Sequence, residues 1–187
     1  RSSGLSAFLI ETGTPGMMLS RPIQKMGLRT SPMGEVVFQD CKVPIENRLG
    51  NEGQGVMIFS SAMEWESACI FASHVGSMQR LLEDTIQYAK SRRQFDKPIS
   101  QFPPVADKIV EMKVSIEAAR LLVYKVGAII DSGGNAMLEA AMAKLFVSEA
   151  HVQQTLDAIQ IHGGYGYSTE FQIERELRDA IPGKLYS

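Results

Sequence analysis

Residues 104–131, PVADKIVEMKVSIEAARLLVYKVGAIID, form the stretch that decides the fold. Apolar side chains recur in it at alternating steps of four and three residues, at Val105, Ile109, Met112, Ile116, Ala119, Val123, Val126 and Ile130. This spacing places all of them along one side of a helix, as in helices that pack lengthwise against other helices. We therefore predict a long helix whose apolar seam lies in a hydrophobic core.

Two further segments are rich in helix-forming residues and free of proline, and they lie on either side of this stretch. They run from residue 55 to about residue 91 and from residue 135 to residue 162. The turn SGGN at residues 132–135 is short, so the helices before and after it are expected to be antiparallel neighbours. The three segments together predict a helical bundle.

A fourth, shorter helix is expected after a glycine-rich turn. Gly163 and Gly164 end the preceding helix, because glycine is the usual residue just past a helix C-terminus. Thr169 and Gln172 then have the three-residue spacing of a capping box, which marks the first turn of a new helix. Pro182 ends it. The predicted fold is thus mainly α, with a four-helix bundle.

The first fifty residues have a different character from the rest. The runs LSAFLI at residues 5–10 and GEVVFQDCKV at residues 34–43 are β-branched and aromatic, and Gly and Pro bound them, which is typical of strands. The change to helical sequence occurs near Asn51. We therefore predict two domains, residues 1–50 with strands and loops and residues 51–187 with helices.

Composition excludes several classes of partner. The net charge of −2 and the pI near 6.0 give no field that would favour nucleic acid or an anionic membrane surface. No run of apolar residues is long enough for a membrane span. Cys41 and Cys69 lie in no zinc or disulfide spacing, which fits a reducing, cytoplasmic setting. No metal site is predicted, and His151 is expected on the solvated side of its helix. Because the chain begins at Arg1, we expect a piece of a longer protein.

One acidic residue falls on an apolar stripe of the first predicted helix. Phe59, Met63, Glu66 and Ile70 are spaced by four, three and four residues, whereas Glu64 lies about 200° around the helix from Glu66. Burying an unpaired carboxylate costs several kcal/mol, so such a group either finds partners or has a raised pKa, which makes it a useful base. The alternative is that Glu66 lies at the edge of the stripe and pairs with a Lys or Arg of the next helix.

Five runs, in chain order, resemble the acyl-CoA dehydrogenases, which are flavoproteins with an N-terminal helical domain, a central β-domain and a C-terminal four-helix bundle. The runs are MGLRTSPMGEVVFQDCKVPIENRLGNEGQG (26–55), AKSRRQFDKPISQF (89–102), EAARLLVYK (117–125), MAKLFVSEA (142–150) and IQIHGGYGYSTEFQIERELRDA (159–180). The resemblance covers nearly the whole chain. It implies that residues 1–50 are the end of the β-barrel-like middle domain and that residues 51–187 are the bundle.

The resemblance also implies FAD as the cofactor and five residues that bind it. The segment that matches Gln160–Gly164 lies against the FAD pyrophosphate and adenosine of a neighbouring subunit in this family, where Gly163 and Gly164 let backbone N–H groups approach the phosphates. Arg92 matches a phosphate partner and Phe95 a residue near the adenine. Asp96 and Pro103 stand where the family usually has Gly and Gln, and an extra negative charge at Asp96 is expected to weaken binding of a pyrophosphate.

The position of the catalytic base differs between branches of this family. Many members carry a Glu directly after the Tyr of a Tyr-Glu-Gly-Thr motif, but in this chain Tyr186 is followed by Ser187, which cannot act as that base. The isovaleryl- and long-chain-type members place the Glu on the first bundle helix instead, at the position of Glu66. The resemblance therefore implies Glu66 as the base, although Ser67 stands where many members have Arg. We expect Met63 and Tyr186 to contact the substrate.

The implied reaction is the FAD-dependent α,β-dehydrogenation of an acyl thioester to its 2-enoyl product. The thioester is either acyl-CoA or a carrier-protein-bound acyl or aminoacyl group, because the helix EWES…ASHVGSMQ also resembles, more loosely, dehydrogenases of carrier-protein-bound prolyl groups. Electrons pass to an electron-transfer flavoprotein or to oxygen. A homodimer or homotetramer is expected, in the cytoplasm or, in a eukaryote, the mitochondrial matrix. The alternative function is a non-catalytic helical scaffold that serves oligomerisation.

Overall fold

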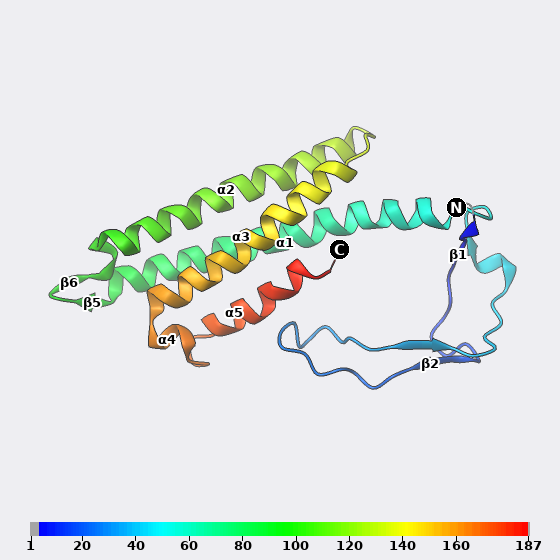
Figure 1. Ribbon diagram of the computed structural model, residues 1–187, viewed down its shortest axis with the longest axis horizontal. Helices are drawn as coiled ribbons and strands as arrows, with labels where there is room; N and C mark the ends of the chain where they lie inside the picture. Colours follow the sequence, from blue (N-terminus) through cyan, green and yellow to red (C-terminus); the bar gives the residue numbers. More distant parts are fainter. Residues whose placement is uncertain (1–3, 187) are drawn as a thin grey trace. The chain divides into compact units, whose positions relative to one another are not determined.

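The computed structural model describes residues 4–186 (Figure 1). The chain separates into two compact units, which divide between Met63 and Glu64. This division lies inside the first helix, α1 (Gly55–Ser91), so the helix contributes to both units. The boundary near Asn51 stays a prediction, since it marks where helical sequence begins rather than where contacts divide.

The first unit is built from short antiparallel strand pairs. Strand β1 (Ala7–Phe8) pairs with β4 (Arg48–Leu49), and β2 (Met17–Leu19) pairs with β3 (Val36–Phe38). A one-turn 3-10 helix, η2 (Ile45–Asn47), precedes β4. β1 and β3 lie within the two predicted strand runs, whereas β2 and β4 were not predicted. Both sheets have two strands, and no closed barrel occurs between residues 4 and 63.

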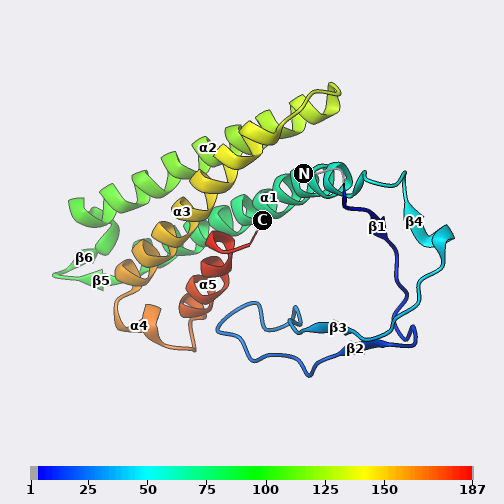
Figure 2. The same cartoon turned by 45° about the vertical axis from the view of Figure 1, so that its right-hand side comes forward.

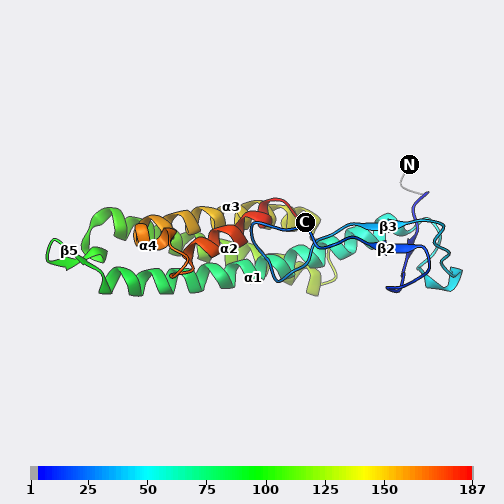
Figure 3. The ribbon, with the colours of Figure 1, turned by 90° about the horizontal axis from the view of Figure 1, so that it is seen from below.

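The second unit is a helical bundle. Beyond Glu64 it contains the rest of α1, α2 (Pro103–Asp131), α3 (Met137–His162), a single turn α4 (Gly164–Tyr167) and α5 (Ile173–Ala180). The hairpin β5 (Arg93–Gln94) and β6 (Lys97–Pro98) and the 3-10 turn η3 (Ile99–Gln101) connect α1 to α2. A last 3-10 turn, η4 (Ile181–Lys184), follows α5. Figures 2 and 3 show α3 alongside α2 and α5, which are its main neighbours.

The predicted seam of α2 is the side that enters the core. Met112, Ile116, Ala119, Val123 and Val126 are all buried. The remaining seam positions, at the two ends of the helix, are partly buried: Val105 and Ile109 pack against the main buried cluster, and Ile130 packs against a second, smaller one that contains Val126. The heptad spacing therefore identified correctly which face of α2 is inside, and the mainly α fold is confirmed.

The predicted start of the last helix is wrong. α5 begins at Ile173, its N-cap is Gln172 in the left-handed conformation with φ 58°, and no side chain caps it. Thr169 lies in the preceding turn. Ring stacking explains why α5 begins later in the sequence than predicted. Phe171 lies on Tyr165 with 4.7 Å between ring centroids and so holds this segment against α4. The capping-box spacing was present in the sequence without the structure that it usually indicates.

Candidate functional site

Glu66 does not occupy the buried row of α1. The side chains that face the core are shifted by one position, to Ser67, Phe71, His74 and Met78, and Glu66 is exposed. The prediction of a core-facing Glu66 is therefore wrong for this chain. Phe59, one of the apolar residues that suggested this position, is misleading. It lies in the first unit and is 65 % exposed, so it does not indicate which face of α1 is buried in the bundle.

The alternative was that Glu66 lies at the edge of the stripe and pairs with a Lys or Arg. The position is correct, but the pairing is not. Glu66 neighbours the buried row, but no Lys or Arg forms an ion pair with it among residues 4–186. Glu64, expected to point away from the core, is half-buried. Met63, a predicted substrate contact, is also half-buried and belongs to the first unit.

Tyr186 links the end of the chain to the ridge that carries Glu66. Glu66, Ile70 and His74 follow one another at four-residue steps, which places them along one row of a helix. The Tyr186 hydroxyl lies 2.7 Å from His74 Nε2. Burial raises the pKa of Tyr186, and the negative charge of Glu66 raises it further. Two predicted site residues, Glu66 and Tyr186, are thus brought within electrostatic reach of each other.

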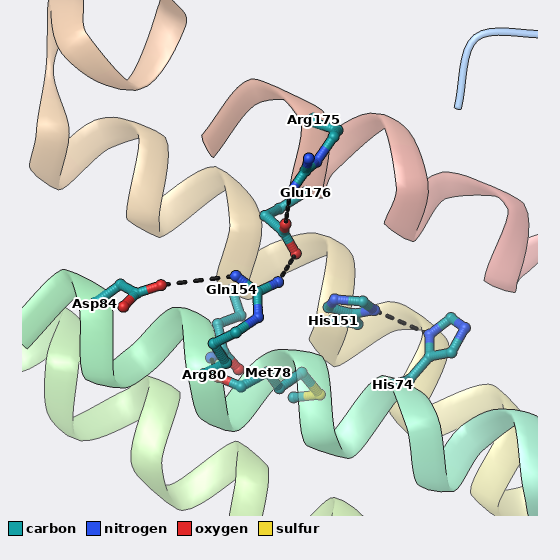
Figure 4. A network of polar contacts seen from close by, with 8 residues as sticks. All are labelled: His74, Met78, Arg80, Asp84, His151, Gln154, Arg175 and Glu176. Atoms are coloured by element: carbon teal, nitrogen blue, oxygen red, sulfur yellow. Dashed lines mark hydrogen bonds and ion pairs between the residues drawn. The ribbon is translucent and has the colours of Figure 1, made fainter. Parts of the chain in front are cut away.

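His74 continues this contact into the interior. Its Nδ1 lies 2.9 Å from Nδ1 of His151 on α3, and both rings are buried (Figure 4). Burial lowers the pKa of His74, and it lowers the pKa of His151 to about 3, together with the charges of His74 and Arg80. Both rings are therefore neutral at pH 7. The expectation that His151 is solvated is wrong, because its helix face packs against α1.

Polar contacts also tie α1 to α3 and α5 around this pair (Figure 4). Gln154 donates from Nε2 to the Met78 carbonyl oxygen at 2.6 Å. The carboxylate of Glu176 on α5 is buried and lies 2.8 Å from a guanidinium nitrogen of Arg80. These contacts fix the relative positions of the helices that carry His74, His151 and the C-terminal segment.

Three of the five predicted cofactor residues line one pocket. The pocket has a volume of about 610 Å³ and is bordered by Arg92, Gly163 and Gly164, together with Tyr88 and Tyr165. The guanidinium carbon of Arg92 lies 5.6 Å from the centroid of the Tyr165 ring. Arg92 forms no ion pair with a carboxylate in the part of the chain that the structure describes, so its charge is available to an anion.

The backbone at the mouth of this pocket is held in a conformation that suits glycine. Gly163 ends α3 with φ 60° and ψ −135°, a region that other residues rarely adopt. The preceding residue, His162, stacks on Tyr88 with 4.1 Å between ring centroids, and the Tyr88 hydroxyl donates to the His162 carbonyl oxygen. A Cβ on Gly163 or Gly164 would meet no atom within 4 Å, so the space beside this backbone is open.

The other two predicted cofactor residues do not line this pocket. Phe95 is 87 % exposed in the turn between β5 and β6, and Gln160 is exposed on α3. Phe95 and Asp96 both have positive φ, at 50° and 63°. Asp tolerates this left-handed conformation better than most residues, which explains how it can replace a glycine here. Pro103 is the first residue of α2, where a missing N–H costs nothing.

Sequence reasoning missed the aromatic walls of this pocket and the buried histidine pair. Tyr88 and Tyr165 have no distinctive spacing. Tyr88 stacks on His162, which is 74 positions away in the sequence, and Tyr165 stacks on Phe171 within the same turn region. No three His, Cys, Asp or Glu side chains are arranged to hold a metal ion within residues 4–186. None of the helices in that range is long and apolar enough to cross a membrane.

Comparisons with known proteins bear on this site. Residues 53–186 match the family described as "Acyl-CoA dehydrogenase, C-terminal domain". An L-prolyl-(peptidyl-carrier protein) dehydrogenase of Pseudomonas fluorescens is 44 % identical over 184 residues, which are 98 % of this chain and 48 % of that protein. The chain thus spans about half the length of the curated relatives it matches.

Solved structures give the same result. The crystal structure of the prolyl acyl carrier protein oxidase AnaB superimposes with a TM-score of 0.97 at 51 % identity, over 99 % of this chain and 49 % of that one. The structure titled "PigA with FAD and proline" superimposes with a TM-score of 0.96 at 43 % identity, over 99 % and 48 % of the two chains. The chain shares the helical bundle and the glycine-rich turn with these relatives, and the similarity covers nearly its whole length. The chain therefore belongs to the acyl-CoA dehydrogenase family, of which it contains the C-terminal helical domain.

Proposed function

We propose that the complete protein is an FAD-dependent oxidoreductase that dehydrogenates the α,β-bond of an acyl thioester. The observation that carries the proposal is the pocket in which Arg92 and the open backbone of Gly163 and Gly164 converge. Membership of the acyl-CoA dehydrogenase family supports it. In this proposal the present chain supplies part of the cofactor site and the proposed base. The part of the complete protein that corresponds to the other half of its relatives' length supplies the rest.

Apart from the carboxylate of Glu170, which also lines it, the pocket has residues that fit a dinucleotide pyrophosphate. Arg92 is a cation without a carboxylate partner in the described chain, and charge-assisted hydrogen bonds from arginine to phosphate are among the strongest in proteins. Gly163 and Gly164 leave room for a phosphate to approach the main chain. Bound FAD supplies the acceptor for the hydride that leaves the β-carbon. Gln160 and Phe95, which lie outside the pocket, remain proposed contacts of the adenosine end.

Glu66 is the proposed base for the α-proton. A carboxylate in water is far too weak to remove such a proton, so the reaction needs a site from which water is excluded. Glu66 is exposed in this chain, and we infer that substrate, flavin and the other domains cover it. Tyr186 and Met63 are the proposed substrate neighbours. The base acts together with hydrogen bonds to the thioester carbonyl, which stabilise the enolate-like charge.

The proposed substrate is a prolyl or related aminoacyl group on a carrier protein, with acyl-CoA as the alternative. The identities of 44 % to the Pseudomonas fluorescens enzyme and 51 % to AnaB support the first. The name of AnaB as an oxidase favours oxygen as the electron acceptor, and an electron-transfer flavoprotein is the alternative. Visible absorbance tests the proposal: purified protein should be yellow and should be bleached by a prolyl-loaded carrier protein. Colourless protein would instead support a non-catalytic scaffold.

Exposed apolar side chains and the two cysteines support proposals for the oligomeric state and the cellular compartment of the protein. Exposed apolar side chains recur on α3 at Leu138, Met142 and Leu145, spaced by four and three residues, which suits an interface between copies of the chain. We propose a homodimer or homotetramer, measurable by light scattering. Cys41 and Cys69 are both unpaired, which fits a reducing compartment such as the cytoplasm.

Replacing Arg92 by Ala is expected to weaken FAD retention about 10- to 100-fold, because a charge-assisted hydrogen bond contributes roughly 1.5–3 kcal/mol. The measurement is the ratio of flavin to protein absorbance after dialysis, followed by titration of the apoprotein with FAD. Lys90→Ala is the matched control, since Lys90 is an exposed cation half a turn earlier that does not line the pocket. Equal flavin affinity in the Arg92 variant and the control would contradict the assignment.

Replacing Asp96 by Gly is expected to raise FAD affinity by about two- to tenfold. The change removes a negative charge from the hairpin that adjoins the pocket, and it relieves a left-handed backbone of φ 63°. Asp96→Asn separates the two effects, because Asn tolerates this conformation but carries no charge. Titration of the apoprotein variants with FAD should show that Asn reproduces most of the gain; a gain seen with Gly alone would assign it to the backbone.

A further inference from the structure

The guanidinium of Arg92 shares its pocket with two groups that attract a cation, the carboxylate of Glu170 and the ring of Tyr165. No ion pair joins Arg92 to Glu170 among residues 4–186. The guanidinium carbon lies over the Tyr165 ring instead, 5.6 Å from its centroid. An arginine that is paired with a carboxylate has less charge to offer a phosphate, so the position of this side chain decides how well the pocket binds an anion.

The main chain of Arg92 is held on both sides, so the freedom that remains belongs to its side chain. The Arg92 N–H donates to the Tyr88 carbonyl oxygen at 2.8 Å, and the Arg92 carbonyl oxygen accepts from the Ile99 N–H at 2.8 Å. The side chain is exposed, and a long exposed side chain samples many rotamers unless a contact restricts it. The face of an aromatic ring attracts a guanidinium within about 6 Å of the ring centroid. Tyr165 meets this condition.

The Tyr165 ring is itself held by rings from other parts of the chain. Phe171 stacks on it with 4.7 Å between centroids and 21° between the ring planes. Phe171 also meets Tyr88 edge to face at 6.5 Å and 81°, and Tyr88 stacks on the buried ring of His162. Offset-stacked and edge-to-face pairs are the arrangements that aromatic rings prefer. This row of rings therefore anchors the surface on which Arg92 lies to the end of α3.

We propose that Tyr165 and Phe171 are positioning residues, which hold the Arg92 guanidinium in the pocket and away from Glu170, so that it can bind the cofactor pyrophosphate. The inference rests on the proposed function, because it takes FAD as the ligand of this pocket. Tyr165 acts directly on Arg92, and Phe171 acts through Tyr165. Neither ring has to touch the cofactor in this scheme.

The test is the dissociation constant of FAD, measured by calorimetric titration of the full-length apoprotein. Tyr165→Leu should weaken binding about two- to tenfold, because it removes the cation–π contact and lets Glu170 compete for the guanidinium. Tyr165→Phe keeps the ring face and should bind within about twofold of wild type. Tyr167→Leu is the matched control, since Tyr167 is an exposed ring of the same turn that does not line the pocket, and it should leave the affinity unchanged.

Two further variants distinguish positioning from a loss of local packing. In an Arg92→Ala background, Tyr165→Leu should cause no further loss, because no guanidinium remains to be held. In the Tyr165→Leu background, Glu170→Gln should recover most of the lost affinity and should raise it by more than the same change does in the wild type. A packing effect would respond to neither change.

Three results decide against one or both proposals. Wild-type affinity in Tyr165→Leu, or an equal loss from Tyr165→Leu with and without Arg92, overturns this inference and leaves the proposed function intact. If Tyr165→Leu fails to fold, Phe171→Leu replaces it in the same cycle, with the same expected loss and the same dependence on Arg92. Wild-type apoprotein that does not bind FAD overturns both.

Discussion

Replacing Glu66 by Gln is expected to leave the flavin colour of the full-length protein unchanged and to slow thioester-dependent bleaching by about 10²- to 10⁴-fold. The range is that of general-base catalysis, because Gln keeps the size of Glu but cannot accept the α-proton. Flavin binding should persist, since Glu66 does not line the pocket of Arg92. Stopped-flow absorbance with a prolyl-loaded carrier protein and with a short-chain acyl-CoA measures the effect.

Glu64→Gln provides the matched control for this experiment. It makes the same chemical change two residues away, about 200° around α1, and should bleach within a few-fold of wild type. Product analysis should show the 2-enoyl thioester in the wild type and the control. If Glu66→Gln reduces its flavin at the wild-type rate, the base lies elsewhere and the assignment fails, whatever the cofactor site does.

The fold was predictable wherever apolar residues recur many times along one face of a long helix. The seam of α2 has eight apolar positions, so an error at one of them could not shift the predicted face. The short stripe on α1 had four positions, two of which lie in the first unit, and it was displaced by one residue. Because one residue turns a helix by about 100°, this small displacement moved Glu66 from the buried row to the exposed surface.

The site was predictable only where the resemblance to a family supplied it. Arg92, Gly163 and Gly164 came from matching motifs, and the structure brings them to one pocket. The pair of His74 and His151 could not be predicted, because residues 77 positions apart meet only through the packing of α1 on α3. Periodicity shows which side of each helix is buried, but it does not specify which polar groups then face each other.

Shortening Ile116 to Ala is expected to destabilise the bundle by about 2–5 kcal/mol, which is the usual cost of removing a fully buried branched side chain without refilling the cavity. Ile116 has no exposed surface and lies at the centre of the α2 seam. Amide hydrogen exchange of α2 in the full-length holoprotein is the measurement, since it reports the stability of this domain within a larger protein. Exchange through global opening should accelerate at least about 30-fold, because each 1.4 kcal/mol corresponds to a factor of ten.

Val114→Ala, two residues earlier at a position 63 % exposed, should change exchange by less than about threefold. Similar acceleration in both variants would mean that the heptad seam does not carry the stability of the bundle, and the argument that derives the fold from that seam would be wrong.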